Sequence, residues 1–330
     1  MNRKKTIILF IICTLLCGCS ANKSNPISKS GLAFDTFITI TLYDTKDEKL
    51  LDECFNLCEF YENLFSRTLP SSEIAKINAG SKNSFTVSNE TAEAIRMGLK
   101  YGDISNGLFD ITIGSVSELW NFKTETPVLP DDTLLKKALS SINYKNLEVD
   151  DNTVILKDSN IKIDLGGIAK GYIADKLKDY LTSKGVKQGI ISLGGNILTI
   201  GKKPNGSDFT IGIQKPFAKQ NQTIASIKIS DKSVVSSGIY ERYFKMNNKI
   251  YHHILNPHTG YPFENNLYEV SIISENSVDG DALSTICFSL GLEKGMELIE
   301  SIEDTEAIFI TDDYSLHYTS GIGKDVILIK

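Results

Sequence analysis

Two oxygen-bearing side chains, Asp281 and Thr285, stand four residues apart in the stretch NSVDGDALSTICFSLG. Positions i and i+4 lie on one face of a helix, so the carboxylate and the hydroxyl would point the same way. Mg²⁺ prefers such oxygen ligands and completes its coordination shell with water and phosphate oxygens. The pair is therefore a candidate cation site, although any acidic helix offers similar spacings.

A second segment, IDLGGIAKGYIAD at 163–175, reads as a strand that meets two glycines and then a helix. Glycines let the backbone approach a ligand closely, and the first turn of a helix offers free N–H groups to phosphate. Lys170 lies in that first turn, where it could reach a phosphate or a carboxylate. The spacing differs from a Walker loop, and a purely structural strand–turn–helix is the alternative.

Three further segments concentrate polar and glycine residues. SLGGN at 192–196 places a glycine pair after a strand, which alone is typical of a bulge. HHILNPHTGYP at 252–262 carries three histidines, but no Cys or Glu pattern of a zinc site accompanies them, so we interpret it as a hydrogen-bonding loop over a ligand. GLFDITIGSVSELWNF at 107–122 sets an aromatic beside an acid, which could frame a planar ring; for Trp120 core packing is the favoured reading.

These segments, taken in their order along the chain, resemble the FAD:protein FMN transferase (ApbE) family of bacterial lipoproteins. The resemblance runs from about Gly31 to the C-terminus. It rests on FSRTLPSSEIAKIN, GLFDITIGSVSELW, DLGGIAKGYIAD, SLGGN, SSGIYERYFKMNNKIYHHILNPHTGYP and DGDALSTICFSLG.

The resemblance implies a Mg²⁺-dependent reaction in which FAD is split at its pyrophosphate. FMN passes to a Thr or Ser hydroxyl of a target protein, and AMP leaves. The implied metal ligands are Asp281, Thr285 and the main-chain carbonyl of Gly167, with Ser284 beside them. The implied FAD contacts are Leu108, Phe109, Asp110, Asp164, Lys170 and Leu255.

Two positions depart from the family pattern. Phe34-Asp35-Thr36 stands where the family often has Met-Gly-Thr, and Thr68 stands where an aromatic residue commonly follows the FSR-like triplet. Both Phe34 and Thr68 correspond to positions near the flavin in the family. We expect both among the FAD contacts, and the departures bear on the strength and pose of FAD binding.

Phosphoryl transfer asks a protein mainly for positioning and for neutralisation of charge, which suits a cation at the pyrophosphate. Asp281 is one candidate for the base that deprotonates the incoming hydroxyl, and His253 is a second. Two alternatives stay open at this point. The same fold could end the reaction in water as an FAD pyrophosphatase, or the protein could be a flavin-binding or solute-binding lipoprotein without catalysis.

The N-terminal residues predict the cellular address. Residues 1–18 have a basic start and an apolar run from Ile7 to Leu16, too short for a mature membrane-spanning helix. The tetrapeptide at 16–19 resembles a lipobox with Cys19 as the lipid-modified residue; an ordinary cleaved signal is the alternative. We expect attachment at the outer face of the cytoplasmic membrane, with an extracytoplasmic target such as a subunit of a membrane redox complex. Residues 19–30 read as a flexible tether before one domain at 31–330.

Charge and cysteine content exclude other classes. The net charge of the 330-residue chain is −6, which becomes −9 without the three basic residues of the signal, and no basic stripe is visible. Nucleic-acid binding is therefore disfavoured. Beyond Cys19, only Cys54, Cys58 and Cys287 remain, and we interpret them as three buried thiols rather than a disulfide framework.

The pattern of expected helices and strands predicts an α+β fold, with a largely antiparallel sheet and packed helices. The resemblance implies the same architecture, that of the ApbE family and the related T-fold. Hydrophobic periodicity predicts helices at 46–66, 71–78, 88–105, 131–141, 168–184, 278–290 and 292–302. Alternating or β-branched runs predict strands at 34–43, 147–155, 161–165, 189–193, 197–200, 209–214, 224–229, 234–236, 242–246, 249–253, 267–273, 306–311 and 315–319.

Overall fold

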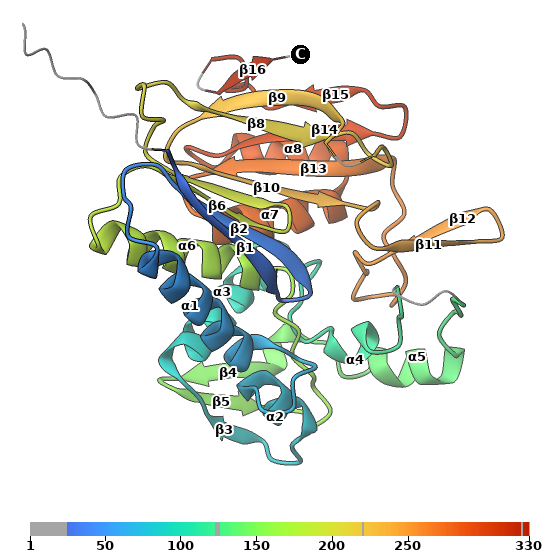
Figure 1. Cartoon of the computed structure of the whole chain (residues 1–330). Helices are drawn as coiled ribbons and strands as arrows, with labels where there is room; N and C mark the ends of the chain where they lie inside the picture. The colour runs from blue at the N-terminus through green and yellow to red at the C-terminus, as the bar shows by residue number, and fades with distance from the viewer. Residues whose placement is uncertain (1–24, 123–125, 220, 325, 330) are drawn as a thin grey trace, which may run out of the picture.

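An eight-stranded antiparallel sheet lies at the centre of the computed structural model, which describes residues 25–122, 126–219, 221–324 and 326–329 (Figure 1). Its strand order is β1-β2-β6-β7-β10-β13-β14-β15. These strands are β1 Ile27–Ala33, β2 Thr36–Leu42, β6 Gly189–Leu193, β7 Asn196–Ile200, β10 Ser233–Gly238, β13 Leu267–Ser274, β14 Glu306–Thr311 and β15 Leu316–Tyr318.

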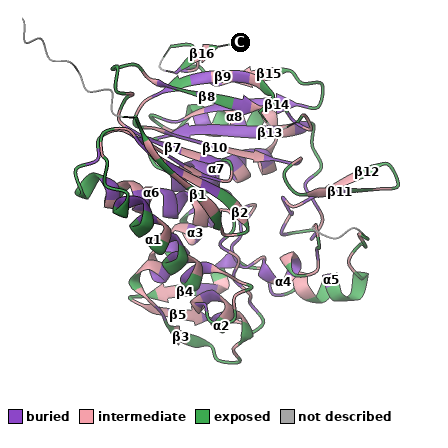
Figure 2. Ribbon diagram, viewed as in Figure 1, coloured by how far each residue is buried: buried purple, intermediate pink, exposed green. Residues whose placement is uncertain are grey.

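The two faces of this sheet enter separate cores because successive strand residues point to opposite sides. On one face, Ile38 and Ile40 of β2 pack with helices. On the other, Val234 and Ile273 pack against a three-stranded sheet, so the middle strands of the central sheet are buried on both sides, whereas β1 and β2 are exposed on one face (Figure 2). The helices are α1 Lys49–Phe65, α6 Ala169–Ser183, α7 Ser277–Leu290 and α8 Leu292–Glu300, and the second sheet is β8 Phe209–Gln214, β9 Thr223–Ile229 and β16 Ile327–Ile329.

Two smaller regions are drawn below and beside the central sheet in Figure 1. One joins a three-stranded sheet to two helices: β3 Ser84–Thr86, β4 Leu147–Asp150, β5 Thr153–Leu156, α2 Glu73–Ala79 and α3 Asn89–Ile104, with the short 3₁₀ helix η1 Tyr144–Asn146. The other gathers α4 Gly114–Ser117, α5 Asp132–Leu139, β11 Tyr243–Met246 and β12 Lys249–His252. Its core is an aromatic cluster around Trp120, so the packing reading of this side chain is confirmed.

The architecture confirms the predicted α+β class with a largely antiparallel sheet. The three cysteines beyond the N-terminal segment are buried free thiols, also as predicted. The signal at 1–18 and Cys19 lie outside the described residues. None of the helices within the described ranges has the length and apolarity that a bilayer crossing requires.

Two of the predicted strands are wrong. The run 147–155 is a hairpin of β4 and β5, because Asp151 adopts a φ of 47° and turns the chain at Asp151-Asn152. The run 161–165 is not a strand, and only an isolated bridge joins Lys162 to Ile113. Its amides are satisfied differently: Ile163 N–H donates to Asn78 Oδ1 and Asp164 N–H to the Ile111 carbonyl.

The start of the domain also differs from expectation. The tether was expected to continue to Ser30, but β1 begins at Ile27 and pairs with β2 along its whole length. The strand expected from Phe34 begins at Thr36, because Phe34 and Asp35 both have positive φ, at 53° and 58°. A two-residue turn of this kind matches the twist of an antiparallel hairpin.

Candidate functional site

Helices α6 and α7 pack against each other at their first turns, and this contact places Asp281. A side chain on Gly171 of α6 would overlap the backbone of α7, with Val278 Cα 2.6 Å from the position of its Cβ. The absence of a Cβ lets the helices meet. The Gly171 N–H then donates to Asp281 Oδ2 at 2.9 Å, and the Asp281 side chain is almost fully buried.

A second carboxylate makes the corresponding contact in the opposite direction, from α6 to the first turn of α7. Asp175 of α6 accepts hydrogen bonds from the first N–H groups of α7, from Ser277 at 2.7 Å and Val278 at 2.9 Å. Each helix therefore uses a carboxylate from its second turn to cap the first turn of the other. Burial raises the pKa of Asp175 to about 7, although both backbone bonds act to lower it. We call this arrangement the reciprocal cap.

Gly167 lies one residue before Ile168, the N-cap of α6, so its carbonyl stands outside the hydrogen-bonded helix. Gly167 precedes Gly171 by four residues, so in a regular helix its carbonyl would accept the Gly171 N–H. That N–H goes to Asp281 instead, and within the described residues no backbone hydrogen bond ends on the Gly167 oxygen. The first turn of α6 thus holds a carboxylate from a residue 110 positions away in the chain, and Gly167 lies just before this turn.

Hydroxyl groups extend this set of oxygens along α7. Ser284 Oγ lies 3.0 Å from the Asp281 carbonyl and 2.8 Å from Ser237 Oγ of β10. Thr285 Oγ1 lies 3.5 Å from the same carbonyl and 3.4 Å from Ser237 Oγ. Thr285 and Asp281 share one face of α7, as the i, i+4 spacing predicted.

The chemical types of the donor atoms suit a hard cation. One carboxylate, hydroxyls and a free carbonyl are the oxygen ligands from which Mg²⁺ chooses, and it commonly uses only one or two carboxylates. Within the described ranges, no group of three or more His, Cys, Asp or Glu side chains is placed to share a metal ion. The residues present therefore suit an ion whose remaining ligands come from water and phosphate.

Lys170 joins this site to the SLGGN turn. Its Nζ lies 3.7 Å from Asp281 Oδ1 and donates to Asn196 Oδ1 at 2.7 Å. The amide nitrogen of Asn196 is buried and has no hydrogen-bond partner. A buried donor without a partner costs free energy unless a ligand uses it. Asn196 was not among the predicted site residues, although the SLGGN motif contains it.

Glu241 is a second residue that the sequence interpretation missed. Its Oε1 lies 3.3 Å from the place that a Cβ of Gly195 would occupy. Burial of the carboxyl group raises the pKa of Glu241 to about 7, although the residue as a whole is exposed. The positive charge of Lys170 lowers this pKa, and the negative charges of Glu269 and Asp281 raise it. The signal available was its position in the segment SSGIYERY.

The loop at 252–262 presents a neutral imidazole. The Nδ1 atom of His253 is buried without a partner, and its backbone N–H donates to the Arg242 carbonyl at 3.1 Å. Burial, with the positive charge of Arg242, lowers the pKa of His253 to about 3. A base with so low a pKa holds a proton weakly at neutral pH, so His253 is better suited to hydrogen bonding than to proton abstraction.

Three of the remaining predicted FAD contacts lie next to the Gly166-Gly167 pair. The ring of Phe109 lies over Gly167, 2.7 Å from the place of a Cβ, and the half-buried Leu108 precedes it. Asp164 is paired with Arg67 at 3.3 Å and accepts the Gly166 N–H at 2.9 Å. These residues flank the glycine pair, as the motif implied.

Other predicted contacts have structural partners of their own. Asp110 accepts hydrogen bonds from Thr112 and from the Tyr144 N–H at 2.9 Å, and Leu255 is buried in the Trp120 cluster. Phe34 sits in the β1–β2 turn, half-buried, while Thr68 is exposed beside Ser66.

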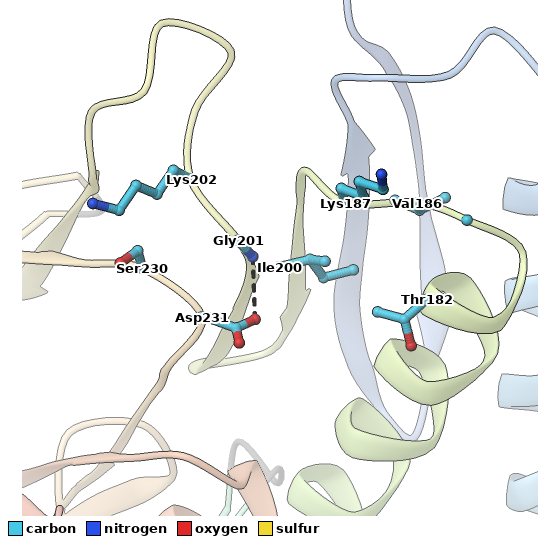
Figure 3. A pocket seen from close by; sticks show the side chains of 9 residues that line it. Thr182, Val186, Lys187, Ile200, Gly201, Lys202, Ser230 and Asp231 are labelled. Carbon is cyan, nitrogen blue, oxygen red and sulfur yellow. Dashed lines mark hydrogen bonds between the residues drawn. The ribbon is translucent and has the colours of Figure 1, made fainter.

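A separate hollow of ≈ 460 Å³ lies at the other end of α6 (Figure 3). At about 1.5 Å per residue, the length of α6 puts it roughly 20 Å from the reciprocal cap. A hydrogen bond from Gly201 N–H to Asp231 Oδ1 crosses it. It contains none of the predicted site residues, and its lining is Thr182, Gly185, Val186, Lys187, Ile200, Gly201, Lys202, Ser230 and Asp231.

Comparisons with known proteins identify the family. The model of the ApbE family matches residues 34–309. An FAD:protein FMN transferase of Klebsiella pneumoniae is 36% identical over 296 residues, covering 89% of this chain and 92% of that protein. One from Treponema pallidum is 30% identical over 337 residues, covering 96% and 93%.

Solved structures show the same fold. The flavin transferase ApbE from Vibrio cholerae superposes with a TM-score of 0.80 at 25% identity, covering 90% of this chain and 97% of that one. The ApbE protein of Thermotoga maritima gives a TM-score of 0.81 at 27% identity with the same coverage.

Proposed function

The chain belongs to the ApbE family, and on that premise we propose that it holds Mg²⁺ at Asp281 while FAD is split and FMN is transferred. It is an FAD:protein FMN transferase, which moves FMN from FAD to a target protein. The cation, the release of AMP and a Thr or Ser acceptor are the proposed parts. One observation carries them: the buried carboxylate of Asp281 lies at the first turn of α6, directly after the Gly166-Gly167 pair, and 3.7 Å from the Nζ atom of Lys170.

The residues of the chain take separate roles in this proposal. Asp281, the Gly167 carbonyl and the hydroxyls of Ser284 and Thr285 hold the cation. When bound, the cation supplies positive charge that offsets the negative charge of the pyrophosphate. Lys170, whose Nζ lies 3.7 Å from Asp281 Oδ1, is the adjacent protein cation and would bind a phosphate oxygen of FAD. The buried amide of Asn196 donates a hydrogen bond to the same ligand.

The flavin portion of FAD lies, in this proposal, along the segments that flank the glycine pair. Phe109 and Leu108 offer an apolar wall, and Asp164 offers an acceptor beside the backbone of Gly166. Phe34, Thr68, Asp110 and Leu255 complete the expected FAD contacts. Asp110 contributes through the shape of its turn, because the protein already occupies its carboxylate oxygens.

The incoming hydroxyl of the target must lose its proton to a nearby acceptor. Asp281 is the candidate that lies in the site as a carboxylate with one oxygen, Oδ1, not used by the reciprocal cap. His253 supplies a neutral Nδ1 that accepts a hydrogen bond and orients the hydroxyl.

Localisation is a further part of the proposal. Cys19 would carry lipid and hold the domain at the extracytoplasmic face of the cell membrane, next to the target protein. Replacement Cys19→Ser should move the enzyme from the membrane fraction to the soluble extracytoplasmic fraction. Unchanged membrane association of this variant would rule out the lipid anchor at this residue.

The decisive experiment replaces Asp281 by Asn and uses Asp175→Asn as the matched control. Both changes weaken one half of the reciprocal cap, but only Asp281 faces the proposed cation. A purified acceptor domain, FAD and Mg²⁺ are incubated with each enzyme, and the intact mass of the acceptor reports attached FMN. We expect Asp281→Asn to lower the rate by about a hundredfold or more, and Asp175→Asn to keep most of the activity if folded.

Two outcomes would count against the proposal. Equal activity of both variants, with equal melting temperatures, would show that Asp281 does not bind a cation that the reaction needs. Release of FMN and AMP from FAD at the same rate without and with the acceptor, and with no mass gain, would identify a pyrophosphatase.

A further inference from the structure

Four lysine side chains gather at one end of the central sheet, around two hollows. The first is the hollow of Figure 3, which Lys187 and Lys202 line. The second, of ≈ 390 Å³, is lined by Lys202, Lys203 and Lys228. Lys203 is half-buried and the other three are exposed. Because they come from three separate segments, only the fold brings them together, and we call these four residues the lysine cluster.

The lysine cluster is positive in a chain whose net charge is −6. The two hollows also contain two aspartates, and each has a lysine partner. Asp208 Oδ1 lies 3.5 Å from Lys202 Nζ, and Asp231 Oδ1 lies 2.9 Å from Lys178 Nζ. Within the described ranges, Lys202 is the one member of the cluster that forms a salt bridge. This surface therefore keeps an excess of positive charge.

The first strand of the domain begins at the same end of the sheet. One row of paired residues crosses four neighbouring strands, β1, β2, β6 and β7, and consists of Ile27, Leu42, Gly189 and Ile200. Lys187 lies two residues before this row on β6, and Lys202 two residues after it on β7. Neighbouring strands are about 4.8 Å apart, so the start of β1 lies roughly 10 Å from the β6 end of the row.

The proposed lipid anchor limits how far this end of the sheet can lie from the membrane. Six residues of chain separate Cys19 from Asn25, whose carbonyl accepts a hydrogen bond from Lys46 Nζ. A chain of this length reaches at most about 20 Å when fully extended. A lipid on Cys19 would therefore keep the start of β1, and the lysine cluster beside it, close to the headgroups.

Helix α6 connects this end of the sheet to the candidate site. Its first turn binds Asp281, whereas Thr182 of its last turn lines the hollow of Figure 3. The helix has 15 residues, which correspond to roughly 20 Å at 1.5 Å per residue. If the lysine cluster faces the bilayer, the candidate site lies on the far side of α6 and stays open to a target protein.

We propose that the lysine cluster is a membrane-facing surface, which binds anionic phospholipid headgroups around the Cys19 anchor and holds the FAD site away from the bilayer. The inference rests on the proposed lipid anchor. Lysines near an anionic membrane are attracted to it, and this attraction acts only within about a Debye length. Each contact is weak, but the anchor makes the contact intramolecular and so raises the effective concentration of headgroups.

The test uses the lipidated enzyme in two kinds of vesicle, phosphatidylcholine alone and phosphatidylcholine mixed with phosphatidylglycerol. An amine-reactive acetylating reagent is added, and peptide mass spectrometry gives the acetylation rate of each lysine. Lys245 and Lys249 of the β11–β12 hairpin are the reference lysines. The variant Lys187→Gln/Lys203→Gln is compared with the matched control Lys245→Gln/Lys249→Gln.

Phosphatidylglycerol should slow acetylation of the lysine cluster about fivefold or more, and added salt should abolish this protection. The two reference lysines should react at the same rate in both vesicles. In Lys187→Gln/Lys203→Gln, the remaining Lys202 and Lys228 should lose most of their protection, whereas the control variant should keep it. FAD affinity and melting temperature should not change in either variant, because both alter only surface charge.

Three results would overturn the proposal. Equal acetylation of the cluster in both vesicles, while the enzyme sediments with them, would reject the lysine cluster and leave the lipid anchor intact. Equal protection in both vesicles, relative to the enzyme in detergent, would show that the short tether alone brings this surface to the bilayer. An enzyme that stays in the supernatant with either vesicle would reject the anchor and the orientation together, and flavin transfer to an acceptor would still test the activity separately.

Discussion

At the scale of single residues, the site is built from side chains that serve the fold and the chemistry together. Asp281 caps α6 with one carboxylate oxygen and offers the other to Lys170. His252, next to the candidate His253, is a contrasting case. It is buried, its Nε2 contacts the Phe263 carbonyl at 3.0 Å, and the Ile254 N–H donates to its Nδ1 at 3.3 Å. That pattern requires the neutral imidazole with a proton on Nε2.

The neutral state of His252 predicts a dependence of stability on pH. Burial lowers its pKa to about 4 in the folded protein, whereas the unfolded value is about 6.5. Between these values the unfolded chain binds the extra proton, so the free energy of unfolding must fall as pH drops from about 6.5 towards 4. We expect His252→Asn to reduce that slope by up to about 1.4 kcal/mol per pH unit.

Urea unfolding at several pH values between 7 and 4.5 checks this prediction. The buried carboxyls are common to both proteins and cancel in the comparison, whereas the difference includes the part of the lowered His253 pKa that comes from His252. Parallel curves for the two proteins over the whole range would show that His252 is already charged in the folded state.

At the scale of elements, the position of α7 against α6 decides whether a site exists. The two helices meet because Gly171 has no side chain, and the reciprocal cap then aligns their first turns. Asp281 binds the N–H of Gly171, one of the first-turn amides of α6 that have no acceptor within the helix. Helix packing therefore creates the oxygen cluster that no single segment contains.

The substitution Gly171→Ala tests this packing. The added methyl would lie 2.6 Å from Val278 Cα, so the helices must separate, at a cost of about 1–3 kcal/mol for an overpacked site. Flavin transfer should fall more than stability, because Asp281 moves away from the start of α6. The control Ser183→Ala, at the exposed last residue of α6, should change neither the melting temperature nor the rate. A Gly171→Ala enzyme with full activity would show that the close helix contact is dispensable.

At the scale of the whole molecule, the domain begins with β1, the edge of the central sheet. Residues Ile27 to Ala33 pair with all of β2, and Lys29 is bound to Asp52 of α1 at 2.7 Å. The chain therefore needs residues from about Ile27 onward to cover β2, four residues earlier than the sequence suggested.

Truncation distinguishes tether from domain. An enzyme that starts at Asn25 should melt as the longer chain does, because every described element is retained. Starting at Asp35 instead removes β1 and the hairpin, and should lower the melting temperature by roughly 5–10 °C, which corresponds to about 3 kcal/mol for a chain of this size. Differential scanning calorimetry gives both values. Equal melting temperatures would place β1 outside the stable fold.

Much of this protein follows from sequence because local patterns depend on nearby residues. The spacing of Asp281 and Thr285, the glycine pair before Lys170, the strand runs and the α+β class were all readable, and the motif order identified the family. Where local signals were ambiguous, the interpretation failed. The Asp-Asn turn that divides β4 from β5 interrupts a run with uniform strand composition, and the run 161–165 has strand composition but bonds to side chains and a loop.

Tertiary structure alone decided which distant groups share the site. The exchange of caps between Asp175 and Asp281 spans more than a hundred residues of chain. Contacts of this kind depend on how closely two helices pack, which is set by the volume of a single missing side chain rather than by periodicity.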